Sequence, residues 1–517
     1  MTIENKKGEL FAIIPKPVKM SILSEKFTLN NETKILADEK CKLIGEYLKE
    51  ILAPSTGFNI PIEDSTKVRS EDNIIFLKLD SKQKTITQEG YILEITQKGI
   101  KISANTSSGI FYGIQSLRQL LSEKIEDSKF VKNIDWTIPC VEIRDYPRFK
   151  WRGFMLDVGR HFWGKEIVRQ ILEVMALLKM NVFHWHLTED QGWRIEIRKY
   201  PKLISVGSKR KETQIGGFSS LETDGIPHEG YYTQEDIREI ISYATKRFIN
   251  IIPEIEMPGH TKAALASYPE LSCSGGPFEV PTLFGIHKDV YCAGKESVFN
   301  FLQDVLDEIM ELFPSEIIHI GGDEVPKNRW KKCTDCQDRI KNKGLKDEDD
   351  LQVYFINRIA DYISSHGRRV IGWNEILHEG LEENVIGQYW SGLKSIVRKH
   401  LQRGRNFVMS NVSHLYLDYS YEAISLSKCY GYDPILRKLE EQFHQNILGI
   451  EAPMWTEWPQ NTQQLYEFIY PRLIAVAETC WTPKENKDFE SFKNRLISFL
   501  KRLDIRGINY AKLEEIK

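Results

Sequence analysis

The sequence predicts an α/β protein in which a (β/α)8 barrel follows a small α+β domain. Eight short apolar runs lie after Phe149, and amphipathic helical segments separate several of them. Such alternation over about 330 residues is typical of the eight parallel strands of a TIM barrel. Polar and aromatic residues recur where the runs end, at the rim that carries the functional residues of a barrel. A doubly wound open sheet is the alternative, but Gly153 and Gly159 do not form the phosphate-binding loop that its first strand would need.

The length of 517 residues exceeds one ordinary domain, so we divide the chain into three parts. Residues 1–146 are expected to form an N-terminal α+β accessory domain, and residues 147–485 the (β/α)8 barrel. Residues 486–517 are expected to form a C-terminal helical segment packed on the barrel. The first boundary is placed near residues 139–147, where prolines interrupt the periodicity.

The N-terminal part shows strand and helix patterns but no catalytic constellation, so we interpret it as a packing or scaffolding domain. The segment Asn73–Asp80 predicts a strand, and Tyr91–Thr96 with Gly99–Ala104 predicts a hairpin. Helical spacing of apolar residues then predicts a helix between Ile110 and Leu121.

The barrel strands are predicted from apolar runs of four to eight residues. These runs are Phe154–Val158, Val182–Leu187, Ile249–Ile255, Ile317–Ile320, Arg369–Trp373, Val385–Trp390, Phe407–Ser410 and Ile447–Met454. Apolar residues at helical spacing predict helices between them, with clear examples over 167–178, 233–248 and 298–313. A final amphipathic helix is predicted over Phe489–Leu503.

The composition argues against several classes of partner. Hydrophobic residues make up 41% and charged residues 28% of the chain, and 70 basic against 73 acidic side chains give a net charge of −3. This balance gives no reason to expect nucleic acid or an anionic membrane as a partner. The stretch Met1–Lys7 has no features of a signal peptide, and no run of 18 apolar residues exists. The chain as given is therefore expected to be cytoplasmic, or secreted if a signal was trimmed.

Eight cysteines are scattered along the chain, too sparsely for a disulfide scaffold. Cys333 and Cys336 form a single C-x-x-C motif, and no second pair follows at the spacing that a zinc site would need. Plain thiols or an incidental disulfide are therefore expected. Pairing of Cys333 with Cys336, or of Cys273 with Cys292, remains open.

Asp323 and Glu324 are the most informative residues, because they follow the strand pattern of Ile317–Ile320 after a Gly-Gly break. Two carboxylates at the end of a buried strand suit cleavage of a glycosidic bond, which needs one protonated and one ionised group. The plain alternative is a capping Asp and a solvated Glu at a turn.

Other strand ends carry residues that suit a ligand pocket. Trp373, Trp390 and Trp455 follow three different runs and favour an aromatic-lined pocket over a simple core position. His184 and His186 lie on one face of a strand and could bind a metal, although hydrogen bonding to neighbouring loops is the preferred interpretation.

Taken together, these segments resemble glycoside hydrolase family 20, the β-N-acetylhexosaminidases. The matching segments are Asp157–Phe162, His184–Trp193, Glu254–His260, His319–Val325, Gly372–Glu375, Tyr416–Asp418 and Met454–Glu457, together with Glu89–Leu121 and Arg502–Tyr510 near the two ends. Their order along the chain is more specific than any single motif. Glu189, Glu256 and Asn374 depart from the family, which commonly has Asp at these positions.

The resemblance implies a retaining exo-β-N-acetylhexosaminidase acting on oligosaccharides or glycoconjugates that end in N-acetylglucosamine or N-acetylgalactosamine. In this mechanism the 2-acetamido group of the substrate attacks the anomeric carbon and forms an oxazolinium ion. Glu324 would be the general acid and base, with a raised pKa, and Asp323 and Tyr416 would hold the acetamido group. No cofactor and no metal are implied, and the oligomeric state is not predicted.

The remaining roles implied by the resemblance concern binding and support of the catalytic groups. The three tryptophans would surround the acetamido methyl group, whereas Arg160, Asp418 and Glu457 would bind the sugar hydroxyls. His260 and Asp190 would support Glu324 through a proton network. The alternatives are a lacto-N-biosidase-type member, a non-catalytic sugar-binding protein on the same scaffold, and a metal-dependent amidohydrolase that uses His184, His186 and His260.

Overall fold

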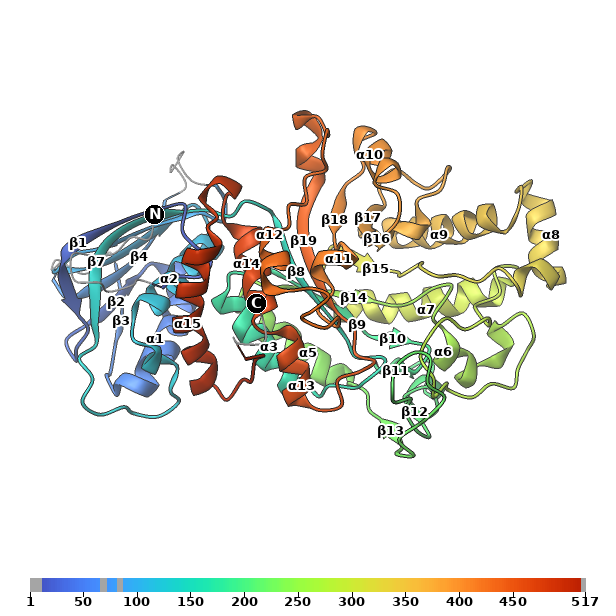
Figure 1. Ribbon diagram of the computed structural model, residues 1–517, viewed down its shortest axis with the longest axis horizontal. Helices are drawn as coiled ribbons and strands as arrows, with labels where there is room; N and C mark the ends of the chain where they lie inside the picture. Colours follow the sequence, from blue (N-terminus) through green and yellow to red (C-terminus); the bar gives the residue numbers. More distant parts are fainter. Residues whose placement is uncertain (1–11, 66–71, 81–86, 513–517) are drawn as a thin grey trace.

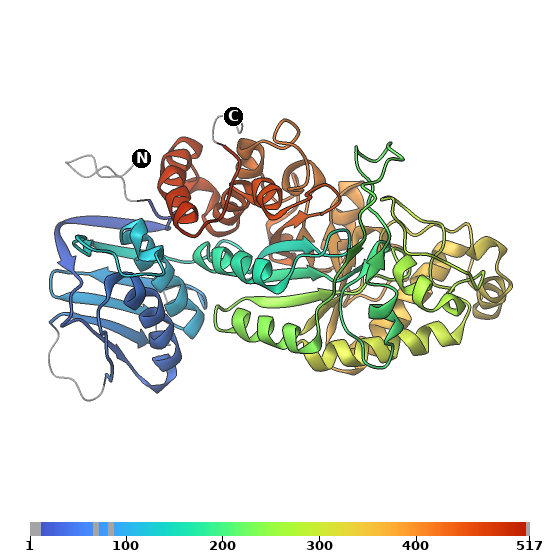
Figure 2. The same cartoon turned by 90° about the horizontal axis from the view of Figure 1, so that it is seen from below.

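The computed structural model describes residues 12–65, 72–80 and 87–512. The stretch Met1–Lys7, from which the absence of a signal peptide is predicted, and the last five residues of the C-terminal segment lie outside the described residues. A sheet domain built from the first third of the chain lies beside a barrel, and the last long helix lies between them (Figure 1). The view from below shows the same two bodies side by side (Figure 2).

The N-terminal domain is a seven-stranded mixed sheet in the order β1-β7-β5-β6-β4-β2-β3. Its strands are β1 (Lys19–Thr28), β2 (Lys34–Ala37), β3 (Ile62–Asp64), β4 (Ile74–Leu79), β5 (Tyr91–Ile95), β6 (Gly99–Ala104) and β7 (Thr137–Asp145). The predicted hairpin is confirmed, since β5 and β6 pair antiparallel with Tyr91 opposite Ala104. The predicted interruption of the strand pattern at Pro139 is not observed. Pro139 lies within β7 opposite Lys26, where the register of β1 shifts and a missing N–H is tolerated.

Helices α1 (Lys42–Thr56) and α2 (Ser107–Leu120) pack against this sheet and against each other. The side chain of Thr106 caps α2 by accepting a hydrogen bond from the backbone N–H of Gly109. Almost every residue of α2 is buried, because the helix lies between the sheet and the barrel. The helix predicted between Ile110 and Leu121 is therefore confirmed as a packing element.

The predicted barrel is confirmed as eight parallel strands in the closed order β14-β15-β16-β17-β18-β19-β8-β9. The strands are β8 (Trp151–Asp157), β9 (Val182–His186), β14 (Asn250–Glu254), β15 (Ile317–His319), β16 (Arg369–Trp373), β17 (Ile386–Tyr389), β18 (Phe407–Met409) and β19 (Ile447–Met454). Each of them overlaps a predicted apolar run. The carboxyl ends of all eight therefore meet at one face of the barrel.

Within the described residues, only helices of six residues or fewer follow β16 and β18, whereas the other six barrel strands are followed by longer helices. They are α3 (Lys165–Leu177), α5 (Gln234–Thr245), α7 (Glu296–Leu312), α9 (Glu348–Ser365), α10 (Lys394–Gln402), α13 (Thr462–Ile469) and α14 (Arg472–Trp481). The loops at the carboxyl ends carry β10 (Thr188–Glu189), β11 (Gly192–Trp193), β12 (Lys209–Arg210), β13 (His228–Glu229), α4 (Lys202–Ser205), α6 (Lys262–Ser267), α8 (Thr334–Lys343), α11 (Val412–Leu415) and α12 (Leu426–Gly431). No helix within the described ranges is long and apolar enough to cross a membrane.

Buried ion pairs join the N-terminal domain to the barrel. Lys179 contacts Asp145 at 2.9 Å with both side chains fully buried, and Arg152 of β8 contacts Glu89 at 2.7 Å. The C-terminal helix α15 (Phe489–Ile505) contacts both bodies rather than the barrel alone. Its Arg495 pairs with Glu478 of α14, and its Arg502 pairs with Glu126 of the N-terminal domain at 3.2 Å.

Glu126 is the centre of a second buried charge cluster at this interface. Its carboxylate contacts Arg118 at 2.5 Å, Arg506 at 2.6 Å and Arg502 at 3.2 Å. Burial alone would raise the pKa of Glu126, but the three guanidinium groups lower it to about 2. The ionised carboxylate therefore stabilises the folded chain at every pH above its ordinary pKa of 4.5.

We expect Glu126→Gln to lower the free energy of unfolding at pH 7 by about 3–5 kcal/mol, because it leaves buried guanidinium groups without their anion. The difference from the wild type should narrow as the pH falls from 4.5 towards about 2, where the wild-type carboxylate is itself protonated. Urea unfolding at several pH values measures this. Glu46→Gln, at an exposed position on α1, is the matched control and should change little. A pH-independent difference would contradict the assignment.

Candidate active site

A cavity of about 520 Å³ opens at the carboxyl ends of the barrel strands. Every site residue predicted from the sequence except Asp190 lines it. These residues are Arg160, His260, Asp323, Glu324, Trp373, Trp390, Tyr416, Asp418, Trp455 and Glu457. They follow seven different strands, so only closure of the barrel brings them together.

The turn after β15 requires both of its glycines. Gly321 and Gly322 have φ angles of 63° and 94°, in the left-handed region that side chains disfavour. A Cβ on Gly321 would lie 1.8 Å from Oε2 of Glu256, and one on Gly322 would lie 2.4 Å from Ile376. Glu324 itself has a φ of 48°, a conformation that costs about 1–3 kcal/mol outside glycine. This strained turn directs the two adjacent carboxylates into the cavity.

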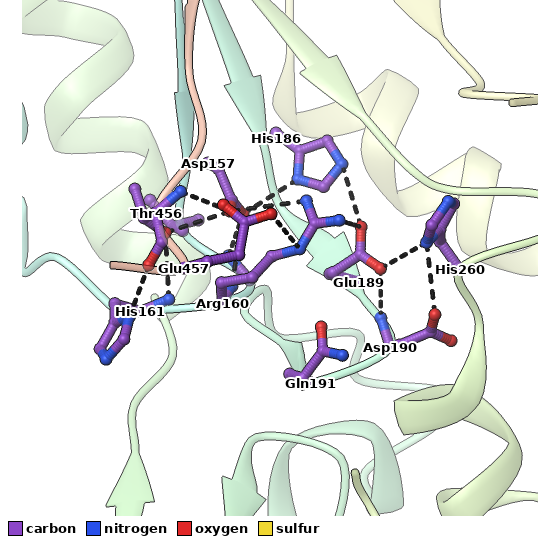
Figure 3. A network of polar contacts seen from close by, with 12 residues as sticks. Asp157, Arg160, His161, His186, Glu189, Asp190, Gln191, His260, Thr456 and Glu457 are labelled. Carbon is purple, nitrogen blue, oxygen red and sulfur yellow. Dashed lines mark hydrogen bonds and ion pairs between the residues drawn. The ribbon is translucent and has the colours of Figure 1, made fainter. Parts of the chain in front are cut away.

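His260 connects two pairs of carboxylates. Its Nδ1 lies 2.8 Å from Glu189 and 3.3 Å from Asp190, and its Nε2 lies 3.5 Å from Glu324 and 3.7 Å from Asp323. Figure 3 shows the first pair, with Glu189 also reached by Arg160. Burial alone would lower the pKa of His260, but the carboxylates of Glu189 and Asp190 raise it well above its usual value. These contacts favour the cationic form of His260.

The predicted raised pKa of Glu324 is wrong for this structure. The contact with His260 lowers the pKa of Glu324, and about a third of its side chain is exposed, so burial opposes this only in part. Asp323 shows the opposite shift, because burial and then the nearby carboxylate of Glu256 raise its pKa well above the usual range. The sequence shows which two carboxyls are adjacent but not that Asp323 is the more deeply buried of the two.

Four aromatic side chains form one wall of the cavity. Ring centroids are 5.7 Å apart for Trp373 and Trp455, 6.0 Å for Trp390 and Tyr416, and 6.3 Å for Tyr416 and Trp455. Two of the rings are fixed by hydrogen bonds to carboxylates. Trp373 donates to Glu254 at 2.9 Å, and Trp390 donates to Glu375 at 2.9 Å. The result is an apolar enclosure next to Asp323.

Arg160, Asp418 and Glu457 line the same cavity. The Arg160 guanidinium contacts Asp157 at 3.5 Å (Figure 3). It also lies 4.8 Å from the Trp455 ring centroid. Burial raises the pKa of Glu457 to about 7, and burial together with Glu457 raises that of Asp418 well above normal. The buried Oδ1 atoms of Asp323 and Asp418 have no hydrogen-bond partner among the described residues. These atoms can bind polar groups of a ligand.

A buried layer of charge beneath the cavity was not predicted from the sequence. Glu254 is fully buried and contacts His319 at 2.7 Å and His184 at 2.9 Å. His186 contacts Asp157 at 3.3 Å and Glu256 at 3.2 Å. An acidic residue inside an apolar strand pattern was the available signal for Glu254, since such a residue is seldom buried without a partner.

The histidines do not form the metal site of the amidohydrolase alternative. Within the described ranges, His184, Glu254 and His319 form one group within metal-ligand reach, and His186, Glu189 and Glu256 form another. His260 belongs to separate groups with Glu189 and Asp190, and with Asp323 and Glu324. No such group contains two of the three histidines His184, His186 and His260.

The rim of the cavity contains residues that the sequence reasoning missed. Phe218, Ile286 and Tyr419 are exposed there, and Trp458 packs edge-on against Phe218 at 4.9 Å. Trp458 follows the predicted strand end closely and could have been found from that position. Phe218 and Ile286 lie on long loops without periodicity, so nothing in the sequence indicates where their side chains lie.

Comparison with known proteins gives one consistent result. Two protein-family models match the chain. The one described as "Glycosyl hydrolase family 20, catalytic domain" matches residues 149–484. The one described as "Glycosyl hydrolase family 20, domain 2" matches residues 11–146. A β-hexosaminidase of Porphyromonas gingivalis is 41% identical over 96% of this chain, and the chain spans only 64% of that relative's length. A β-hexosaminidase of Akkermansia muciniphila is 33% identical, with 87% of this chain and 91% of that protein covered. A mutant β-hexosaminidase of Streptomyces plicatus, solved in complex with product GlcNAc, has a TM-score of 0.84 at 30% identity and covers 98% of this chain and 97% of its own.

We expect Gly321→Ala to reduce kcat/KM on the order of 10²-fold, because the added methyl group displaces Glu256 and the turn that carries Asp323. Gly367→Ala is the matched control. Gly367 has a similar φ of 74°, but a Cβ there meets no atom within 4 Å. The control should lose some stability and keep its activity. Equal losses of activity in the two variants would show that backbone strain, and not the contact with Glu256, decides the effect.

Proposed function

The chain belongs to glycosyl hydrolase family 20, and from this premise we propose that it is a retaining exo-β-N-acetylhexosaminidase. The substrate would be an oligosaccharide or glycoconjugate that ends in N-acetylglucosamine or N-acetylgalactosamine. The observation that carries the proposal is the placement of Asp323 and Glu324 side by side, next to a four-ring aromatic enclosure. This pairing suits a substrate that supplies its own nucleophile, since neither carboxylate has to attack the anomeric carbon.

Binding would use the polar side chains that line the same cavity as the aromatic residues. Arg160, Asp418 and Glu457 would form hydrogen bonds to the hydroxyls of the terminal sugar. Asp418 has a buried oxygen without a partner among the described residues, so a sugar lacking the matching hydroxyl would leave it unsatisfied. Such sites discriminate strongly against substrates that lack the group they bind.

The acetamido group would enter the enclosure formed by Trp373, Trp390, Tyr416 and Trp455. The rings would restrict rotation of its methyl end, while the Tyr416 hydroxyl would donate to the carbonyl oxygen. Asp323 would accept the hydrogen bond of the acetamido N–H. These contacts hold the carbonyl oxygen near the anomeric carbon in an attacking geometry.

Asp323 would contribute most in the transition state. Burial and Glu256 make an anion costly at this position in the substrate-free site, as its raised pKa indicates. Positive charge that develops on the cyclising acetamido group would offset this cost. An interaction that is stronger in the transition state than in the ground state lowers the barrier instead of only tightening binding.

Glu324 would protonate the leaving oxygen and then deprotonate the attacking water. In the substrate-free site the contact with His260, 3.5 Å away, lowers the pKa of Glu324. A bound sugar would exclude water from Glu324 and favour its neutral form, so a proton could move from His260 to Glu324. Glu189 and Asp190 would keep His260 charged and correctly oriented.

We expect Glu324→Gln to lower kcat on the order of 10²–10⁴-fold for a disaccharide substrate, the usual contribution of general acid–base catalysis. The rate of the first step should fall less for an aryl glycoside, because its leaving group needs little protonation. Steady-state kinetics on both substrates measure the difference. Glu379→Gln, at an exposed position beyond β16, is the matched control and should retain wild-type rates. Wild-type turnover of both substrates by Glu324→Gln would refute the assignment.

We expect the 2-acetamido group to be essential for hydrolysis. The p-nitrophenyl N-acetylglucosaminide should be cleaved at least about 10⁴-fold more efficiently than the corresponding glucoside, a ratio typical of sites built around one polar group. Release of nitrophenol measures both. Equal cleavage of the two would exclude a substrate-assisted reaction. Release of nitrophenol from neither aryl glycoside would favour the sugar-binding alternative. Release of disaccharides alone from an oligosaccharide substrate would favour the lacto-N-biosidase type.

A further inference from the structure

Four of the eight cysteines meet at one point outside the active site. Sγ of Cys292 lies 3.6 Å from the sulfurs of Cys333 and Cys336, and Cys273 lies 3.8 Å from Cys336. All four sulfurs lie within 4.8 Å of one another. We propose that these residues, called here the four-cysteine cluster, bind one zinc ion as a structural site. The proposal differs from the expectation of plain thiols or an incidental disulfide, because the second pair of cysteines lies upstream of the C-x-x-C motif and not after it.

The spacing of the sulfurs fits a tetrahedral zinc ion. Four Zn–S bonds of about 2.3 Å in a tetrahedron separate neighbouring sulfurs by about 3.8 Å. A disulfide would bring two of the sulfurs to about 2.05 Å. None of the described cysteines is bonded to another. Three of the four cysteines in the cluster are buried. Tetrahedral sets of soft thiolates are typical of zinc sites.

The surrounding backbone holds three separate segments together at the cluster. Cys273 follows the short 3-10 helix Pro269–Leu271, Cys292 precedes α7, and Cys333 and Cys336 lie at the start of α8. The backbone N–H of Cys292 donates to the carbonyl of Leu271 at 2.9 Å. Ser272 also forms a β-bridge with Tyr291. These bonds bring the first two cysteines together without the help of the third and fourth.

Gly294 lets the segment around Cys292 approach the first turn of α8. A Cβ at this glycine would lie 2.2 Å from the carbonyl carbon of Asp335 and 2.4 Å from the backbone nitrogen of Cys336. Arg339 of α8 donates to the carbonyl of Gly294 at 2.7 Å, and Trp330 donates to that of Tyr291 at 2.9 Å. The chain is therefore built to bring the C-x-x-C turn against the other two cysteines.

The local charges suit bound thiolates. Cys333 is the N-cap residue of α8, a helix of ten residues whose free backbone N–H groups favour negative charge at this end. Lys295 donates to the carbonyls of Ser272 and Glu270 at 2.7 Å and 2.9 Å, beside Cys273. Zinc would neutralise half of the charge of four thiolates. The helix end and Lys295 would stabilise part of the remainder.

The cluster joins two loops that carry active-site residues. Cys273 and Cys292 belong to the loop after β14, which also carries His260, and the other two cysteines follow Asp323 and Glu324 after β15. A second link joins the same two loops, because Asp289 contacts Lys262 at 2.5 Å and Arg329 at 2.7 Å. With four protein ligands the zinc ion would have no open position, so its role would be structural. The zinc ion would keep the loops that carry His260 and Glu324 at a fixed distance from each other.

Metal analysis of the purified full-length chain tests the site directly. We expect one zinc ion per chain by plasma mass spectrometry, retained through dialysis, and eight free thiols after denaturation with chelator. Cys336→Ser should lose most of the zinc, whereas Cys140→Ala, at a buried cysteine in β7, should retain it. Fewer than eight thiols without metal would show disulfides and overturn the proposal. Eight free thiols in a chain that retains no zinc after exposure to zinc would overturn the proposal as well. One bound iron per chain in place of zinc would also overturn it.

A second measurement remains valid if Cys336→Ser does not fold. Replacing zinc with cobalt(II) in the wild-type chain should produce the visible bands of tetrahedral thiolate coordination. Cys273→Ser, at the partly exposed ligand, should weaken and shift these bands and lower the thermal unfolding midpoint. A cobalt spectrum without sulfur-to-metal charge transfer would exclude the cluster as the binding site. Zinc content is measured independently of turnover, so its absence would leave the proposed hydrolase function untouched.

Discussion

The position of His260 between two pairs of carboxylates is the interaction on which the active site depends. The cavity and the residues beneath it concentrate acidic groups, many of them buried, and buried carboxylates cannot all ionise without nearby cations. His260 and Arg160 supply positive charge from opposite sides, and both contact Glu189. Burial is the main cause of the raised pKa of Asp323 and Glu457, whereas the contact with His260 lowers the pKa of the partly exposed Glu324.

The same constraint extends beneath the cavity. Glu254 lies at the end of β14 among His184, His186 and His319, and it also orients the indole of Trp373. One buried anion therefore connects the charged layer of the barrel to the aromatic wall of the cavity. A buried network of this kind is stable only when each member has its partner, so these residues act as a unit.

Two features outside the cavity support this arrangement. Ion pairs at Glu126, Lys179 and Arg152 join the N-terminal sheet and α15 to the barrel. The four-cysteine cluster lies where the loops after β14 and β15 meet. Both loops are long and carry little regular structure, and long segments of this kind need additional links to hold catalytic side chains in place.

The sequence by itself determined the barrel, its eight strands and the residues that gather in the cavity, because apolar periodicity and the residues at strand ends are local signals. It did not determine the pKa order of Asp323 and Glu324, the partners of Glu254 or the rim residue Phe218. It also did not show that Cys273 and Cys292, on another loop, lie within 4.8 Å of Cys333 and Cys336. All of these depend on distances between segments remote in sequence, and only barrel closure and loop packing decide such distances.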